Sequence, residues 1–187
     1  MSRESPRSAL FDGMLRVVAL GAVTSTALLA PGAVQIFDKP LRSLGKNLDQ
    51  EARYREMRRA LQYLKQNRLV TEDYEHGLTL TKKARKRLQK LDFEAITLPT
   101  LTTWDGRWRI VFFDIPEERK SGRDAFAARL RHLGFRVLQR SVFIYPQPCR
   151  QEVAAIATYL HLEKYITYVE VTHIDKDASL RKAFKLA

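Results

Sequence analysis

Asp114 is the residue whose setting most suggests chemistry, because it ends an apolar run just before Pro116. The turn-forming residues 104–107 (Trp-Asp-Gly-Arg) come first, and residues 108–113 (Trp-Arg-Ile-Val-Phe-Phe) follow. A short apolar run bounded by turn signals is typical of a buried strand. The pattern predicts a strand that delivers one carboxylate to the edge of a sheet. Two roles stay open for it: a catalytic carboxylate, or one that caps the next helix or pairs with a neighbouring arginine.

A second group of candidate residues lies on a predicted helix over residues 50–66, for which Asp49 is a suitable N-cap. Apolar residues recur along it at steps of three and four, which makes one face a core face. The opposite face is rich in arginine and glutamine, which can each make two hydrogen bonds to a purine in the major groove. A solvated helix face would show the same pattern. The predicted base-reading residues are Arg55, Arg58, Arg59 and Gln62.

A hairpin and a basic helix are predicted directly after this helix. Residues 69–74 and 78–81 alternate like strands around a turn at 75–77, and a helix capped by Thr81 follows. This order is typical of a winged helix-turn-helix, with the hairpin as the wing. Acidic residues in the hairpin (Glu72, Asp73, Glu75) would weaken its grip on a minor groove. The predicted phosphate contacts are Lys82, Lys83, Arg85 and Lys86.

The formal net charge of +12 favours a polyanionic partner, with nucleic acid ahead of an anionic membrane surface. The chain has a single cysteine, Cys149, and four histidines without ligand spacing. These counts predict no disulfide framework and no cysteine- or histidine-based metal site, and they suit a reducing cytoplasm.

Residues 17–37 form a segment without any charged residue, and this segment is long enough to span a bilayer. Pro31 and Gly32 interrupt the run, so the sequence predicts a buried first helix that ends there. Membrane association or export is the alternative. A membrane-associated adaptor anchored by residues 14–37 is therefore the third of three functional hypotheses, although a membrane partner is not expected.

The second half alternates between strand and helix patterns. We expect strands at 108–115, 135–138, 141–145 and 165–174, and helices at 119–133 and 149–160, with Gly134 as the C-cap of the first helix. This is the βαββαβ order of a ferredoxin-like domain. The predicted fold class is α+β. The predicted domains are a winged helix-turn-helix at 8–91, an extended linker at 92–103, a ferredoxin-like domain at 104–176, and a helical tail at 177–187 that could pack on a partner.

Two resemblances follow from these motifs. Residues 104–174 resemble the ferredoxin-like domain of the second CRISPR-associated (Cas) adaptation protein, through residues 110–115 and 134–143. The order of the whole chain resembles the phenylacetate-pathway repressor (PaaX) family. That family has an N-terminal winged helix and then a ferredoxin-like domain, entered through a Trp-Asp-Gly-Arg-Trp element like residues 104–108.

The PaaX resemblance implies a transcriptional regulator that binds double-stranded DNA as a homodimer and needs no cofactor to do so. The Cas resemblance implies the alternative, a nuclease in which Asp114 from each of two subunits shares Mg²⁺ or Mn²⁺, with Ser141 nearby. Whether the protein is an enzyme stays open at this point, with a regulator favoured.

Overall fold

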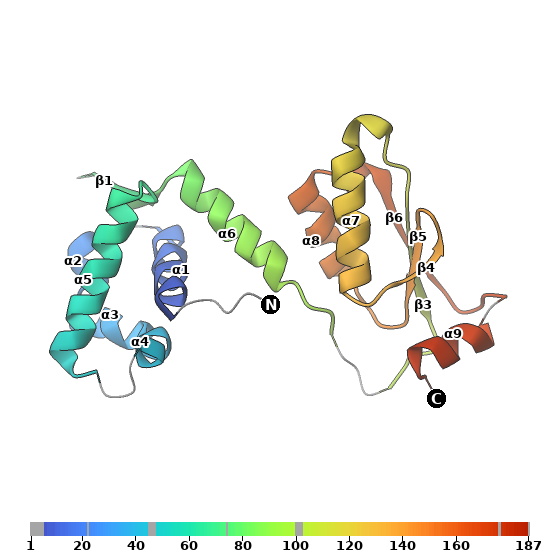
Figure 1. Ribbon diagram of the computed structural model, residues 1–187, viewed down its shortest axis with the longest axis horizontal. Helices are drawn as coiled ribbons and strands as arrows, with labels where there is room; N and C mark the ends of the chain where they lie inside the picture. Colours follow the sequence, from blue (N-terminus) through green and yellow to red (C-terminus); the bar gives the residue numbers. More distant parts are fainter. Residues whose placement is uncertain are drawn as a thin grey trace. The chain divides into compact units, whose positions relative to one another are not determined.

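The computed structural model describes residues 6–21, 23–44, 48–73, 75–99, 103–175 and 177–186. The chain divides into two compact units, Met1–Asp92 and Phe93–Ala187 (Figure 1). Each unit is described by itself below. No helix in the described ranges is both long enough and apolar enough to cross a membrane.

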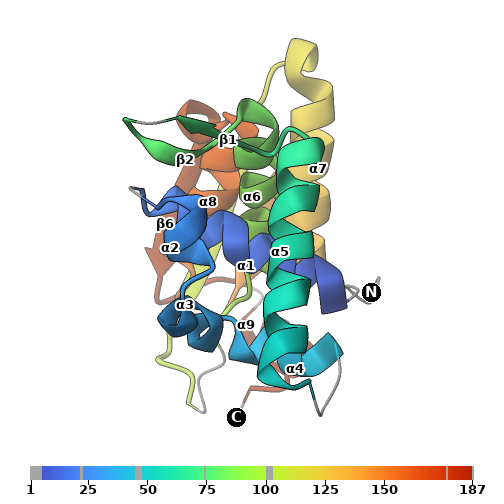
Figure 2. The ribbon, with the colours of Figure 1, turned by 90° about the vertical axis from the view of Figure 1, so that its left-hand side faces the viewer.

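The first unit is mainly helical and has one small hairpin. Figure 2 shows α1 and α5 with the hairpin β1–β2 at one end of α5. One apolar core, which includes Leu10 and Met14 of α1, holds these elements together. The elements in chain order are α1 (Pro6–Ala19), α2 (Ser25–Leu28), α3 (Pro31–Ile36), α4 (Asp38–Leu44), α5 (Gln50–Gln66), β1 (Val70–Asp73), β2 (Gly77–Leu80) and α6 (Lys82–Ala95).

The helix α5 forms as the sequence predicts. The Asp49 carboxylate accepts a hydrogen bond from the Ala52 backbone N–H at 2.7 Å, which satisfies one free N–H of the first turn. Met57, Leu61 and Leu64 are buried on one face. At 17 residues α5 is about 25 Å long, from a rise of 1.5 Å per residue. Its apolar face fixes its rotation and leaves the opposite face to solvent.

The prediction of a buried first helix that ends at Pro31 and Gly32 is wrong. Helix α1 ends at Ala19, Gly21 has a φ of +91°, and the Thr24 side chain caps α2. Pro31 begins α3 instead of ending a helix, since its fixed φ and missing N–H suit the first helical turn. Leu20 is 87% exposed. The uncharged run is therefore divided among the end of α1, α2 and α3.

The hairpin has a third participant that the sequence did not reveal. Strands β1 and β2 form the predicted antiparallel hairpin, with pairs from Val70↔Leu80 to Asp73↔Gly77, so Gly77, expected in the turn, belongs to β2. Val23 forms a bridge to Leu78 on the other side of β2, and its carbonyl accepts the Leu78 N–H at 2.7 Å. Tyr74, predicted as the end of the first strand, lies outside the described residues.

Helix α6 extends further than predicted and takes in the first residues of the expected linker. Residues 92–95 are helical, so the prediction of an extended segment from residue 92 is wrong there. The Arg129 guanidinium accounts for the helix end: it donates to the carbonyls of Phe93, Glu94 and Ile96 at 2.8–3.1 Å. A cation at a helix C-terminus satisfies otherwise free carbonyls. Residues 100–102 of the expected linker lie outside the described ranges.

The second unit has the predicted βαββαβ order. Its sheet runs β4-β5-β3-β6 with every neighbouring pair antiparallel. A 3-10 turn (Glu117–Arg119) precedes the first helix, which begins one residue later than expected. The elements are β3 (Trp108–Phe113), α7 (Lys120–His132), β4 (Arg136–Gln139), β5 (Val142–Tyr145), α8 (Arg150–Leu160), β6 (Ile166–Val171) and α9 (Asp177–Phe184).

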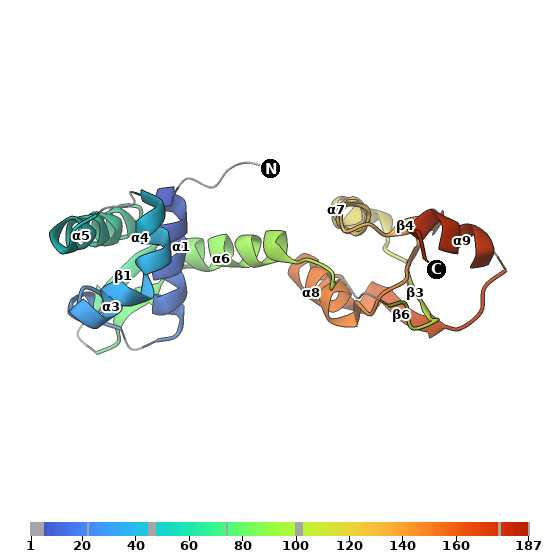
Figure 3. The same ribbon diagram turned by 90° about the horizontal axis from the view of Figure 1, so that it is seen from below.

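Apolar residues fill both faces of this sheet. Helices α7 and α8 cover one face over Val111 and Phe113, and α9 covers part of the other over Trp108 (Figure 3). Leu180 of α9 is buried against Trp108 and Ile144. The tail is helical as expected, but its apolar residues pack on the sheet of their own unit, so no partner is needed to cover them.

Candidate nucleic-acid interface

The four predicted base-reading residues share one exposed face of α5. We call Arg55, Arg58, Arg59 and Gln62 the α5 basic face; all four are exposed. At 3.6 residues per turn they fall within an arc of about 100°. Met57, Leu61 and Leu64, on the opposite side, are buried. The structure therefore brings these four residues together, and it presents them on a helix that is anchored from behind.

The charges of this face are only weakly compensated. Arg59 donates to Glu56 at 2.7 Å, and Arg55 lies 3.8 Å from Glu51. Both arginine side chains are at least 60% exposed, so each pair contributes little stability and can be exchanged for a phosphate or a base. The side chains of Arg58 and Gln62 form no hydrogen bond or ion pair with any other described residue. The face can thus meet a polyanion without first breaking a strong internal contact.

The predicted phosphate contacts at the start of α6 are all exposed, but they do not form one surface. Lys83 donates to the Asn67 carbonyl at 3.1 Å, at the C-terminal end of α5. Arg85 lines a cavity of about 740 Å³ between the end of α1, the hairpin and α6. By helical geometry Lys83 and Arg85 point about 160° apart. Lys82 and Lys86 lie between these two directions, so at most three of the four side chains can follow one phosphate strand.

The acidic residues of the hairpin hold the unit together. Glu72 accepts hydrogen bonds from Lys65 of α5 at 2.6 Å and from the Ser25 hydroxyl at 2.7 Å. These contacts, with Lys65 the largest cause, lower the pKa of Glu72 from 4.5 to about 2. The Asp73 carboxylate accepts the backbone N–H groups of the turn, mainly that of His76, which lowers its pKa. The sequence suggested that these acids would repel DNA; two of them instead fix the shape of the hairpin.

A buried polar contact sets the position of α6 against α1. Asp12, only 7% exposed, accepts a hydrogen bond from Arg87 at 2.7 Å, and Arg87 also donates to Ser8 at 3.0 Å. Asp12 lies among the buried apolar residues of α1. Its partner lies 75 residues away in sequence, so the residues alone could not identify it.

Asp114 lies at the end of β3 and is exposed. Its backbone N–H donates to the Tyr165 carbonyl at 3.1 Å, which continues the β3–β6 ladder by one residue. The structure shows neither structural role considered for it: Arg119 is the N-cap of α7, Pro116 is that of the preceding 3-10 turn, and no arginine in the described ranges pairs with the Asp114 carboxylate. Within the described ranges, no other residue binds the Asp114 carboxylate, and no three acidic, histidine or cysteine side chains are grouped to hold a metal.

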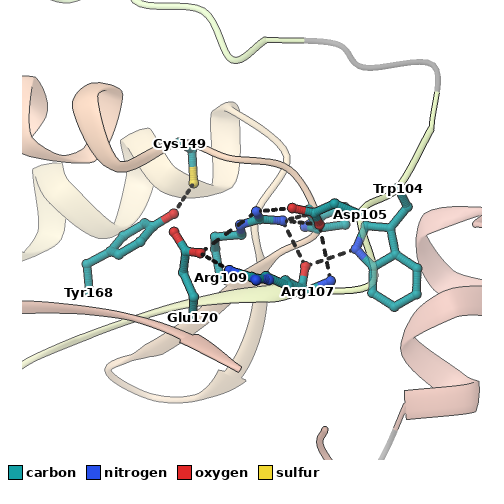
Figure 4. A network of polar contacts seen from close by, with 8 residues as sticks. Trp104, Asp105, Arg107, Arg109, Cys149, Tyr168 and Glu170 are labelled. Atoms are coloured by element: carbon teal, nitrogen blue, oxygen red, sulfur yellow. Dashed lines mark hydrogen bonds and ion pairs between the residues drawn. The ribbon is translucent and has the colours of Figure 1, made fainter. Parts of the chain in front are cut away.

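Sequence reasoning missed a buried arginine in the segment that leads to Asp114. Arg109 has a side chain that is 3% exposed, and it pairs with Asp105 (Figure 4). Its guanidinium also donates to the carbonyls of Arg107 at 2.9 Å and Pro146 at 2.8 Å. The hydrogen bond between the Arg109 and Asp105 side chains is the main cause that lowers the pKa of Asp105 and raises the pKa of Arg109. An arginine inside an apolar run was the available signal.

The same segment anchors α9. Trp108 donates from Nε1 to the Asp177 carboxylate at 2.7 Å, and the Arg181 guanidinium lies 4.5 Å from the centre of the Trp104 ring. Residues 104–109 therefore hold α9 against β3, and we call this segment the clamp.

Residues 101–183 match a family described as the PaaX protein central Cas2-like domain. The second unit is similar to the PaaX central Cas2-like domain. The matched range begins just before the clamp at residues 104–109 and ends within α9, so it includes β3 and most of α9, which the clamp joins. No curated protein matches the sequence. The predicted resemblance of the second unit is confirmed, and the match does not extend to the first unit.

Proposed function

We propose that this PaaX-like protein is a cytoplasmic, DNA-binding transcriptional regulator. In this proposal the first unit is a winged helix-turn-helix that binds double-stranded DNA through the α5 basic face, with no cofactor. The second unit pairs two copies of the chain. The observation that carries the proposal is the α5 basic face itself, an exposed row of arginine and glutamine on a helix whose other face is fully packed.

The arrangement around α5 supports the winged-helix assignment. Helix α4 precedes α5, and Arg53 of α5 donates to Asp38 of α4 at 2.7 Å, which fixes the angle between them. The hairpin follows α5 directly, and the isolated Val23–Leu78 bridge adds one further pairing on the other side of β2. A helix pair that presents its second helix, with a small sheet behind it, is the geometry that places a recognition helix in the major groove.

An uncovered part of the sheet supports the pairing of two copies. Side chains alternate along β3, so Phe112 shares the face that α9 covers over Trp108. Phe112 is nonetheless 39% exposed, and its cross-strand neighbour Thr167 is also exposed. A second copy that packs on this face would bury Phe112 and would place two α5 helices about a two-fold axis.

The test is a selection of bound duplexes from a random DNA pool by the full chain, followed by affinity measurements on the selected sequence. Replacing Arg59 by alanine should weaken specific binding by about 1–3 kcal/mol. Arg42 is the matched control, because it is equally exposed (68%) and equally paired but lies on α4. If R59A and R42A bind the selected duplex equally well, α5 is not the recognition helix.

A metal-dependent nuclease is the second candidate, and the free, exposed carboxylate of Asp114 favours it. Asp114 continues the row of Trp108, Ile110 and Phe112, so a dimer through this face would bring two such carboxylates toward each other. They could then share Mg²⁺ or Mn²⁺, which prefer oxygen ligands. Cleavage of DNA or RNA that needs metal and disappears in Asp114→Asn, with duplex binding retained, would establish this activity. No cleavage by the wild type would exclude it.

A further inference from the structure

The second unit has a hollow of about 240 Å³ beside the end of β3, walled largely by arginine. We call it the arginine hollow. Arg123 and Arg131 reach it from α7, and Arg140 and Ser141 from the turn between β4 and β5. Asp124 and the ring of Phe113 complete the part of the wall that matters here. All of these residues belong to the second unit.

The positive charge of the hollow is largely uncompensated. Arg123 is engaged with Glu117 at 2.9 Å, and the Asp124 carboxylate lies 3.9 Å from its Nε. Arg131 rests over the Phe143 ring at 5.4 Å and, like Arg140, has no carboxylate partner in the described part of the chain. Two guanidinium groups therefore face the hollow with no opposite charge of their own.

The chemistry of the wall suits one tetrahedral anion. Guanidinium groups present paired N–H donors that match the oxygens of a phosphate. The half-buried Ser141 hydroxyl adds a further donor, because it has no hydrogen-bond partner among the described residues. The Ser141 backbone carbonyl accepts the Phe113 N–H. The conformation of the turn does not explain why Arg140 and Ser141 stand here. Two-residue hairpin loops usually contain glycine or asparagine because they need a positive φ, and neither Arg140 nor Ser141 has a positive φ.

We infer that the arginine hollow is a second nucleic-acid contact, which binds one phosphodiester group of a DNA or RNA backbone. The contact is independent of sequence, since only phosphate is recognised. It goes beyond the proposed function, which assigns DNA binding to the first unit alone, and it does not depend on the α5 basic face. Free phosphate offers the same oxygens, so the experiment must separate the two sources.

The experiment measures binding of the full chain to a labelled random-sequence duplex over a range of salt concentrations. The variant is Arg131→Gln with Arg140→Gln. The matched control, Lys182→Gln with Lys185→Gln, removes the same two charges from exposed positions of the same unit. Loss of two phosphate contacts should reduce the slope of log affinity against log salt by about 2 and weaken binding about 10- to 100-fold at 50 mM salt. Equal slopes for variant and control would overturn the inference.

A second background separates this inference from the proposed function. In a chain that carries Arg55→Ala, Arg58→Ala and Arg59→Ala, the α5 basic face loses its three positive charges. Residual duplex binding that the hollow variant then abolishes supports the inference, whatever α5 does. Melting of the protein with added inorganic phosphate identifies the other source. If phosphate raises the melting temperature of wild type but not of the hollow variant, while duplex binding is equal in both, the hollow binds free phosphate and the nucleic-acid contact is wrong.

Discussion

Replacing Arg109 by methionine is the sharpest test of the clamp in the second unit. Methionine keeps most of the apolar stem of the side chain and removes the guanidinium. The Pro146 carbonyl, in a buried residue, then loses its donor. A buried group left without its partner costs about 1–3 kcal/mol, and a hydrogen bond to a charged group contributes about 1.5–3 kcal/mol.

These contributions do not simply add. Asp105 is 42% exposed and can be hydrated again, and the Arg109 Nε already has no acceptor. We therefore expect a net loss of about 3 kcal/mol, at the lower end of the range for breaking a buried ion pair. For a unit of 95 residues (93 to 187) this corresponds to a melting temperature lower by about 12–24 °C.

Intrinsic tryptophan fluorescence is the appropriate readout, because both tryptophans, Trp104 and Trp108, lie in the second unit. Unfolding in urea followed at this signal reports on that unit alone. Arg107→Met is the control: its side chain is 58% exposed and lies 3.8 Å from Glu170, so it should cost less than about 1 kcal/mol. If R109M and R107M unfold at the same urea concentration, the buried pair does not stabilise the unit as argued.

Three further predictions follow from local geometry. Because the pKa of Glu72 is lowered from 4.5 to about 2, the contribution of Glu72 to stability should be complete above pH 4.5 and lost as the pH falls toward 2. In circular-dichroism melts, Glu72→Gln should remove that part of the acid sensitivity. Gly77→Ala should destabilise the hairpin by about 1–3 kcal/mol, since Gly77 has a φ of +67° and an added Cβ would lie 2.8 Å from the Val23 carbonyl oxygen. Gly106 also has a positive φ, but no atom lies near its added Cβ, so Gly106→Ala should lower stability by less. Cys149 should resist thiol reagents in the native state at pH 8 and react after denaturation, because burial raises its pKa to about 12; fast labelling of the folded protein would contradict this.

The elements with strong local signals could be predicted from the sequence. The Asp49 cap and the apolar spacing of Met57, Leu61 and Leu64 determine α5 within a few turns of chain. The alternation of strand and helix in the second half likewise predicts the βαββαβ order. In both cases the residues that decide the structure are close together in the chain.

The errors arose where local signals conflict or where the partner is distant. Pro31 can end a helix or begin one, and only the packing of α3, whose Val34 is buried in the core of the first unit, decides between these. Residues 92–95 continue α6 because Arg129, more than thirty residues later, binds its last carbonyls. Sequence patterns alone do not reveal such pairings, because hydrogen bonds across the fold leave no periodic trace.

The arginines of this chain divide into two classes that one pair of measurements can separate. Arg87, Arg109 and Arg129 bind carboxylates or carbonyls inside their units, so their replacement should lower stability and leave the salt dependence of DNA binding unchanged. Arg58 and Arg140 are exposed and have no carboxylate partner among the described residues. Their replacement should therefore reduce the salt dependence of DNA binding and leave stability unchanged. The net charge of +12 does not distinguish these classes, because a clamped arginine counts as much as a free one. A variant of the second class that lowers stability as much as it lowers the salt slope would show that the two roles are not separate.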